Sequence, residues 1–451
     1  MSNAQVLPGG TGKFARGVHP PDNKQFAADA AIEVLPSPEA VSIPLLQHTG
    51  APCRNLVKPK QELTWGEKIG DTDAFISAPV HASIAGTAGR ETVTTLPNGR
   101  HVPTVPIDAG DERPTAEEIR AEIFGGDWPT GKMDSFQPAQ IADAARQAGL
   151  VGLGGAAFPT SVKLTTNPAK PIDTILVNGC ECEPFLTADY RLMLEYPAPI
   201  VTGALLAARA TGARQILIAV EDNKPAAIDA LCKAAAGTDI QVASLHTQYP
   251  MGGEKQTIKA SLGREVPTGG LPLDVGVVVI NVGTAAALAR AVLRGKPLTH
   301  RVITVSGGGV NTPRNILAPI GVTYGQLIDF AGGLNDSAAR VVAGGPMMGF
   351  ALGDLDAVVT KGTSGVTVLT AEDIARTEET RCVRCGRCVD VCPLNLVPTK
   401  IALAARQKQW DLARTYHMQA CMECGCCAYT CPAGIPLVQL MRMGKAQMPR
   451  E

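Results

Sequence analysis

Between residues 138 and 300, short apolar runs alternate with segments that carry an apolar stripe at helical spacing. The runs at 173–178, 215–220 and 275–280 are rich in Ile and Val and have the length of buried strands. Stripes of helical period lie between them and around them, at 141–148, 200–210, 226–236 and 285–293. Because strands that alternate with helices form parallel sheets, this region predicts a Rossmann-like α/β domain.

The rest of the chain has a different pattern. Residues 1–130 hold short apolar runs that Pro and Gly interrupt every few positions, which is typical of β structure. A strand, a helix and a strand are expected at 301–306, 324–330 and 341–349, and helices at 398–418 and 435–447. We therefore expect a multidomain α/β chain, divided at 1–130, 131–299, 300–355 and 368–451.

Cysteine is distributed unevenly along the chain. Cys53, Cys180, Cys182 and Cys232 are scattered, and the other nine lie between residues 382 and 431. Two runs share one spacing, in which three cysteines with two-residue gaps precede a fourth that is followed by Pro. This spacing is typical of proteins with two iron–sulfur cubanes, in which the fourth cysteine of each run ligates the other cluster.

We therefore assign one [4Fe-4S] cluster to Cys382, Cys385, Cys388 and Cys431, and the second to Cys421, Cys424, Cys427 and Cys392. Cys426 breaks the spacing of its run, so we interpret it as a non-ligand. Zinc held by four cysteines is the alternative, but zinc sites use paired knuckles rather than triplets that end in Cys-Pro. The helices expected after each run favour an α-helical ferredoxin domain over a small β-type ferredoxin.

Charge and hydropathy exclude several classes of function. Lys and Arg number 41 against 42 Asp and Glu, so the chain offers no electrostatic footprint for nucleic acid or for an anionic membrane surface. The best apolar run, 275–289, is too short to span a bilayer and contains polar residues. No basic segment followed by an apolar stretch opens the sequence, so we expect a cytoplasmic location. Any role at a membrane then depends on protein partners.

Four segments near predicted strand ends carry candidate binding residues. A Gly-rich loop at 152–163 ends in Lys163, and 178–184 places Asn178, Glu181 and Glu183 directly after a strand. Segments 249–256 and 281–284 each lead into a helix, whose N-terminus favours anions. Because ligands bind beyond the carboxyl ends of parallel strands, these segments predict a nucleotide site. The alternatives are a plain connecting turn for the first and a solvated acidic loop for the second.

With these segments in this order, the chain resembles the RnfC subunit of the Rnf electron-transport complex over nearly its whole length. The resemblance rests on Gly-Val-His-Pro-Pro near the start, Gly-Gly-Ala-Ala-Phe-Pro-Thr, Glu-Cys-Glu-Pro, Gly-Gly-Glu-Lys-Gln, Asn-Val-Gly-Thr, Gly-Gly-Pro-Met-Met-Gly and the double cysteine run. The middle of the chain is also similar to the NADH-oxidising flavoprotein subunit of respiratory complex I, which binds FMN and NADH in one pocket.

The resemblance implies a barrel-sandwich fold for 1–130, an FMN- and NADH-binding domain at 131–299 and a β-grasp, soluble-ligand-binding module at 300–355. It implies FMN contacts from Lys163, Asn178, Glu181, Gly253, Glu254, Asn281 and Thr284, with Phe158 and Glu183 helping to seat NADH. Gly152, Gly154, Gly155 and Lys255 complete the expected cofactor-binding set, and no residue is assigned an acid–base role. Cys180 and Lys255 stand where the complex I pattern has Asp and Glu.

The implied activity is NADH oxidation, or NAD⁺ reduction, on FMN, followed by single-electron transfer through two [4Fe-4S] clusters. The implied partners are other subunits of a membrane complex, with a ferredoxin or ferredoxin-like subunit among them, and the implied place is the cytoplasmic side of the inner membrane. Coupling to Na⁺ or H⁺ would belong to those other subunits. Two alternatives remain: a flavin and iron–sulfur cobalamin reductase of the microcompartment type, and a non-catalytic relay with an empty flavin pocket.

Overall fold

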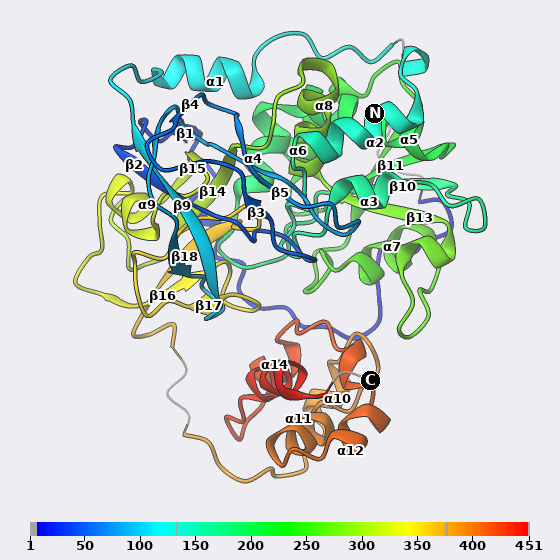
Figure 1. Cartoon of the computed structure of the whole chain (residues 1–451). Helices are drawn as coiled ribbons and strands as arrows, with labels where there is room; N and C mark the ends of the chain where they lie inside the picture. Colours follow the sequence, from blue (N-terminus) through cyan, green and yellow to red (C-terminus); the bar gives the residue numbers. More distant parts are fainter. Residues whose placement is uncertain (1–6, 132, 375–377, 450–451) are drawn as a thin grey trace.

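The computed structural model describes residues 7–131, 133–374 and 378–449. Three sheet-containing parts form the upper body of the molecule, and an all-helical C-terminal part lies below it (Figure 1). Short 3₁₀ turns occur at Lys24–Phe26, Met133–Ser135, Pro272–Val275 and Met418–Ala420. None of the helices in the described ranges combines the length and the apolar character needed to cross a bilayer.

The N-terminal part consists of two antiparallel sheets followed by a helix, as the predicted β character of this region requires. One sheet runs β2-β9-β7-β4 with β8 beside β9, and the other runs β3-β5-β6. Their bounds are β2 Ala40–Pro44, β4 Glu62–Leu63, β7 Gly86–Ala88, β8 Thr92–Thr95, β9 His101–Ala109, β3 Arg54–Asn55, β5 Lys68–Asp71 and β6 Val80–His81. Helix α1 (Ala116–Phe124) follows, with a capping box from Thr115.

The middle part is a parallel sheet between two helical layers. Its strands are β10 (Thr174–Asn178), β11 (Gln215–Glu221), β12 (Ile240–Leu245) and β13 (Val277–Asn281). Alternate side chains of the strands pack on α5 and α8 on one face and on α7 on the other. The helices are α2 Pro138–Gln147, α3 Thr160–Leu164, α4 Ala188–Glu195, α5 Pro197–Thr211, α6 Pro225–Ala234, α7 Glu254–Leu262 and α8 Val282–Arg294. Strand β12 was not predicted, because its polar residues dilute the apolar signal.

A mixed six-stranded sheet follows, in the order β1-β15-β14-β18-β16-β17. It draws β1 (Ile32–Val34) from the N-terminal region and β18 (Gly365–Thr370) from beyond the predicted module. The other elements are β14 His300–Ser306, β15 Arg314–Pro319, β16 Ala338–Ala343, β17 Phe350–Ala351 and α9 Tyr324–Phe330. The sheet therefore ties two distant parts of the sequence together.

The C-terminal part contains two copies of one loop-and-helix unit. In each copy a cysteine loop leads into a short helix and then a longer one: α10 Arg387–Asp390 and α11 Pro398–Arg406, then α13 Cys426–Tyr429 and α14 Leu437–Gln447. Left-handed backbone recurs at equivalent positions, at Arg384 and Glu423 and again at Gly386 and Gly425. The two copies pack α11 against α14 around a shared apolar core.

The single helix predicted at 398–418 is wrong. Helix α11 ends at Arg406 and α12 (Trp410–Thr415) starts after a turn. Lys408, the residue that interrupts the apolar stripe, has a φ of 55°. A residue in the left-handed region ends a right-handed helix, so the stripe continues across two helices rather than along one.

A short N-terminal clasp, residues 16–18, holds the C-terminal part against the middle part. The Arg16 guanidinium donates to the Val389 carbonyl at 2.7 Å, and the Gly17 amide donates to the Val391 carbonyl at 3.1 Å. The next residue, Val18, exchanges backbone hydrogen bonds with Tyr249. The clasp therefore joins the first cysteine loop's helix to the loop that precedes α7.

Gly203 allows the close approach of α5 and α8. A Cβ at this position would lie 1.8 Å from the backbone oxygen of Ala285. We predict that Gly203→Ala lowers the free energy of unfolding by about 1–3 kcal/mol, because overpacking outweighs the gain in helix propensity. Thermal unfolding measures the change. Gly325→Ala is the control, since its Cβ meets nothing closer than 3.6 Å, and a Gly203→Ala protein as stable as wild type would contradict this packing.

Lys361 is a buried amine at the junction of three parts of the chain. Its Nζ donates to the carbonyls of Pro79 at 2.5 Å and Gly149 at 2.7 Å, and burial lowers the pKa of Lys361 to about 7. A neutral amine has two N–H groups, which matches these two acceptors.

The unfolded chain therefore binds one more proton than the native protein between about pH 7 and the ordinary lysine pKa near 10.5. We predict that this group makes wild-type stability rise by about 3 kcal/mol between about pH 6 and about pH 9. Lys361→Met removes that increment, and pH-dependent denaturant unfolding of both proteins measures it. Parallel pH profiles would show that Lys361 keeps an ordinary pKa in the native protein.

Candidate functional site

The strand order of the parallel sheet reverses between β10 and β13, and we call the carboxyl-end edge of the sheet at this point the crevice. The chain builds β11 and β12 on one side of β10 and then crosses to place β13 on the other side. Asn178 and Asn281, the last residues of β10 and β13, face each other in register. Ligands of open α/β sheets bind at such a switch point, so the strand topology itself selects this edge.

The Gly-rich loop lies above the crevice. Thr284, buried in the first turn of α8, accepts the Leu153 amide at 2.9 Å, and Gly152 donates to the Phe158 carbonyl at 2.8 Å. The amides of residues 154–158 make no hydrogen bond of good geometry within the described ranges. Consecutive free amides form a concave donor surface for anionic or carbonyl oxygens, which is what a phosphate or a flavin ring presents.

Thr49 of the N-terminal part fixes the orientation of this loop. Its amide donates to the Ala157 carbonyl and its hydroxyl to the Ala156 carbonyl, each at 3.0 Å. Because the N–H and C=O of a trans peptide point in opposite directions, the amides of Ala157 and Phe158 are turned away from Thr49. Ala157 also has a φ of 48°, a strained value that the contacts from Thr49 support.

Lys163 and Glu254 meet at the crevice. The Lys163 ammonium pairs with the Glu254 carboxylate and donates to the Val279 carbonyl at 2.9 Å. Glu254 is the first residue of α7 and follows Gly253, the N-cap. The pair brings a cation and a helix N-terminus to one place, which suits a ligand with negatively charged oxygens.

Asn281 has two local partners. Its side-chain oxygen caps α8 through the Gly283 amide at 2.8 Å, and its amide nitrogen donates to Asp189 at 2.6 Å. Burial and the negative charge of Glu181 raise the pKa of Asp189 to about 7. Gly154 lies beside Asn281, where a Cβ would come within 3.5 Å. Asn281 therefore connects the Gly-rich loop to the carboxyl group of Asp189.

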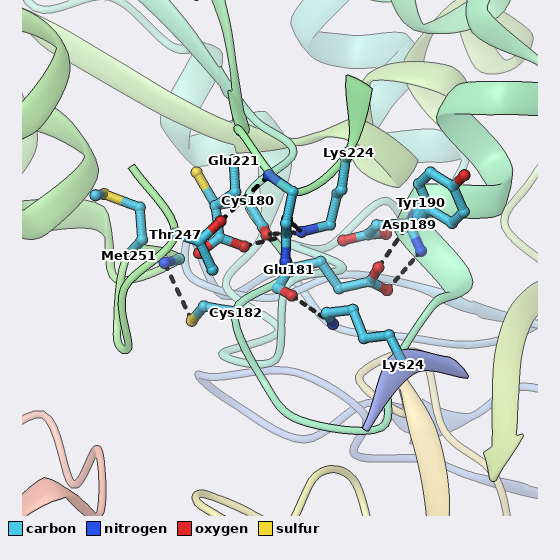
Figure 2. Close-up of polar contacts among 12 residues, drawn as sticks. Lys24, Cys180, Glu181, Cys182, Asp189, Tyr190, Glu221, Lys224, Thr247 and Met251 are labelled. Carbon is cyan, nitrogen blue, oxygen red and sulfur yellow. Dashed lines mark hydrogen bonds and ion pairs between the residues drawn. The ribbon is translucent and has the colours of Figure 1, made fainter. Parts of the chain in front are cut away.

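The turn after β10 is held by two lysines, the buried Lys224 and the half-buried Lys24, that approach it from two sides (Figure 2). Lys224 donates to the Cys180 carbonyl and to Glu221, both at 2.9 Å, and Lys24 donates to the carbonyls of Glu181 at 2.9 Å and of Glu183 at 3.1 Å. Burial tends to lower the pKa of Lys224, but Glu221 and Glu181 raise it above its ordinary value, so Lys224 stays charged.

Glu181 and Glu183 are engaged with the protein rather than directed freely into the crevice. Glu181, at a φ of 40°, accepts the amides of Asp189 at 2.7 Å and Tyr190 at 3.0 Å, at the start of α4 (Figure 2). Glu183 is half-buried and accepts the amides of Met347 and Met348 at 3.2 and 2.8 Å. Burial raises the pKa of Glu183 to about 7, although these two amides oppose the shift.

The second cysteine loop packs directly against the middle part. The Tyr249 hydroxyl donates to the Cys424 carbonyl at 2.6 Å, and the Met422 methyl lies on Gly253. Gly425 approaches Met347 so closely that a Cβ would lie 2.6 Å from its carbonyl oxygen. Val18, Tyr249, Cys424 and Cys426 form one buried group at this contact.

Four of the predicted ligands line one cavity behind this contact. They are Cys392, Cys421, Cys424 and Cys427, with apolar walls from Ile401, Val438 and Met441. Cys392 therefore leaves its own run and joins the second one, as the crossed assignment requires. Backbone amides donate to the sulfurs of Cys392 at 3.4 Å and Cys421 at 3.3 Å, and such donors stabilise cluster thiolates.

The other four predicted ligands lie at the outer end. Burial raises the pKa of Cys388, and the nearby thiols of Cys431, Cys382 and Cys385 raise it further. Cys382 and Cys385 are exposed. Within the described ranges, no three His, Cys, Asp or Glu side chains converge closely enough to hold a single metal ion. Cubane ligands do not need to converge in this way, because each cysteine binds a different iron atom.

The structure thus gathers Gly152, Gly154, Gly155, Phe158, Lys163, Asn178, Gly253, Glu254, Asn281 and Thr284 around the crevice. Lys255 instead donates to the Pro267 carbonyl at 3.2 Å, and Asn178 donates to the Gly252 carbonyl at 2.8 Å. Sequence reasoning missed Lys24, Thr49, Asp189 and Lys224 as supports of the site. Their partners lie far away in the chain, or are backbone groups, and neither leaves a local pattern.

Family models match four consecutive regions of the chain. They are the RnfC barrel sandwich hybrid domain at 12–112, the Nuo51 FMN-binding domain at 145–290, an SLBB domain at 302–351 and a 4Fe-4S dicluster domain at 381–435. The expected multidomain fold, with its helical dicluster domain, is confirmed, and the dicluster match favours iron–sulfur clusters over zinc. An NAD⁺-reducing [NiFe]-hydrogenase is a structural neighbour at a TM-score of 0.48 and 23% identity, covering 73% of this chain and 65% of that one.

Curated relatives match nearly end to end. The RnfC subunit of the proton-translocating ferredoxin:NAD(+) oxidoreductase complex of Clostridium ljungdahlii is 41% identical, over 89% of this chain and 86% of the relative. Its counterpart in the Na(+)-translocating complex of Acetobacterium woodii is 40% identical over 97% of both chains. The counterpart in the ion-translocating oxidoreductase complex of Rhodobacter capsulatus is 37% identical over 96% of this chain and 82% of the relative. The chain therefore belongs to the RnfC family, the family of this one subunit of the Rnf oxidoreductase complexes.

Proposed function

We propose that this chain oxidises NADH, or reduces NAD⁺, at FMN bound in the crevice and exchanges single electrons with a partner subunit through two [4Fe-4S] clusters. One observation carries the proposal: an FMN-binding domain packs against the cavity that Cys392, Cys421, Cys424 and Cys427 help to line, with Tyr249 and Cys424 in direct contact. Hydride exchange between NADH and FMN and the transfer of electrons to the first cluster would then occur on neighbouring surfaces.

The residues at the crevice fit a flavin nucleotide. When bound, FMN supplies the exchange between a two-electron hydride and single electrons. The free amides of residues 154–158 would hold its polar oxygens, and Lys163 would place a cation near them. The contacts from Thr49 and Asn281 keep this loop in one shape, so that the site is formed before the ligand binds. Phe158 is the candidate for stacking against NADH.

The cysteines divide into an inner and an outer set. We assign the inner cluster to Cys392, Cys421, Cys424 and Cys427, since these line the cavity next to Tyr249. We assign the outer cluster to Cys382, Cys385, Cys388 and Cys431, of which the first two are exposed. Electrons that leave the crevice would reach the inner cluster first and depart from the outer one.

The subunit would work at the cytoplasmic face of the membrane, because thiolate-ligated clusters and NADH need a reducing compartment. Ion movement would belong to membrane-embedded partners. The barrel sandwich domain and the end-to-end relatives argue against the alternative of a microcompartment cobalamin reductase. An electron relay without flavin is the alternative that the next experiment decides.

Anaerobically purified protein should contain FMN and about eight iron atoms per chain. We predict that NADH bleaches both the flavin and the iron–sulfur absorbance and supports reduction of an artificial acceptor. Succinate is the control donor and should do neither. Protein that contains iron but no flavin would leave the electron relay as its only function. Reduction of the acceptor by succinate but not by NADH would refute NADH as the electron donor.

Two single variants test the order of the clusters. In Cys431→Ser the outer cluster loses a ligand, so we predict that NADH still reduces flavin and the inner cluster, seen by low-temperature electron paramagnetic resonance. In Cys392→Ser the inner cluster is damaged, so NADH should reduce flavin but leave the outer cluster oxidised. Cys53→Ser, far from both sets, is the matched control. The reverse pattern would show that the first run lies closer to the flavin.

A further inference from the structure

The outer cysteine loop, residues 381–387, carries an exposed positive charge. Arg381, Arg384 and Arg387 alternate with the exposed Cys382 and Cys385. None of the three guanidiniums makes an ion pair among residues 7–131, 133–374 and 378–449, and Arg16 adds a fourth cation where it reaches the Val389 carbonyl. Of the two acidic residues just before the loop, Glu379 is paired with Arg406 at 2.6 Å and Glu378 is exposed.

The second loop is an internal control, because it has the same backbone and the same cysteine spacing. The positions equivalent to Arg381, Arg384 and Arg387 hold Ala420, Glu423 and Cys426. Glu423 is paired with Lys445 at 2.8 Å and with Arg442 at 3.1 Å, and Cys426 is fully buried. Arginine is therefore not a requirement of a cluster loop, and its presence on the outer loop needs another reason.

The two loops also differ in what covers them. Met422 of the inner loop packs on Gly253, and this contact docks the loop against the middle part. The equivalent residue of the outer loop is Val383, whose side chain is 64% exposed. The inner loop thus shows how an apolar residue at this position is used in a docked state. In the outer loop the residue at this position, Val383, faces solvent and lies in the same loop as the three arginines.

We propose that residues 381–387 form the docking surface for an acidic electron-carrier protein, with Val383 as the apolar anchor and the three arginines as its charged rim. This inference rests on the proposed function, since it takes the outer cluster as the exit of the electron path. Charge complementarity selects the partner: unpaired guanidiniums attract carboxylates and speed encounter, and they repel a basic carrier. In the docked complex, the partner's own cluster would lie next to Cys382 and Cys385.

The test compares the triple variant Arg381→Gln, Arg384→Gln, Arg387→Gln with a control that removes the same charge elsewhere, at the exposed Arg90, Arg100 and Arg340. The holoprotein is assayed with NADH and with two acceptors, a small acidic two-cluster ferredoxin and the cation hexaammineruthenium(III). We expect the loop variant to raise the KM for ferredoxin at least tenfold at low salt and to flatten its salt dependence. With the ruthenium complex, the rate of the loop variant should stay the same or increase. In the control variant, the KM for ferredoxin and the KM for the ruthenium complex should each change by no more than twofold.

Equal KM values for ferredoxin in the two triple variants would overturn the proposal. Equal losses with both acceptors, together with a shifted midpoint potential of the outer cluster, would also overturn it, because the arginines would then act on the cluster itself. Direct binding of ferredoxin to immobilised holoprotein gives a second reading that needs no NADH. If wild type binds ferredoxin in a salt-dependent way that the loop variant loses, docking stands even where NADH oxidation fails. Val383→Asp should weaken this binding without changing cluster content.

Discussion

Electron transfer through protein requires donor and acceptor to lie close together, so the contact between the second cysteine loop and the flavin-binding part is the constraint on which the rest of this structure depends. The Tyr249 hydroxyl reaches the Cys424 carbonyl at this contact, and Met422 packs on Gly253. The N-terminal clasp joins the same residue, Tyr249, to the helix of the first cysteine loop. A chain that had both binding sites but lacked this contact would bind its cofactors without transferring electrons between them.

The same constraint explains why one loop occurs twice with different surfaces. The two copies of the loop provide two cluster-binding sites, because the fourth cysteine of each run ligates the cluster of the other run. The inner copy contains no arginine and packs against Tyr249 and Met347, whereas the outer copy carries three exposed arginines. The surface of each copy thus matches its surroundings. The inner copy faces another part of the same chain, and the outer copy faces solvent.

Much of this organisation could be predicted from sequence because the signals are local. Cysteine spacing identified the cluster loops, and runs of Ile and Val identified three of the four parallel strands. Strand β12 and the break at Lys408 were missed, since a diluted apolar run and a single left-handed residue barely alter the pattern. The roles of Thr49 and Lys24 could not be predicted, because each acts on backbone groups more than a hundred residues away.

The central claim is the placement of the inner cluster between the flavin crevice and the outer loop. Anomalous X-ray scattering at the iron absorption edge, on anaerobic crystals of the holoprotein, tests it most directly. The account predicts two iron sites, one inside the cavity of Cys392, Cys421, Cys424 and Cys427 and one beside Cys382, with flavin density under the Gly-rich loop. Iron bound by Cys382, Cys385, Cys388 and Cys392 together, or a flavin nearer to the first loop than to the second, would contradict it.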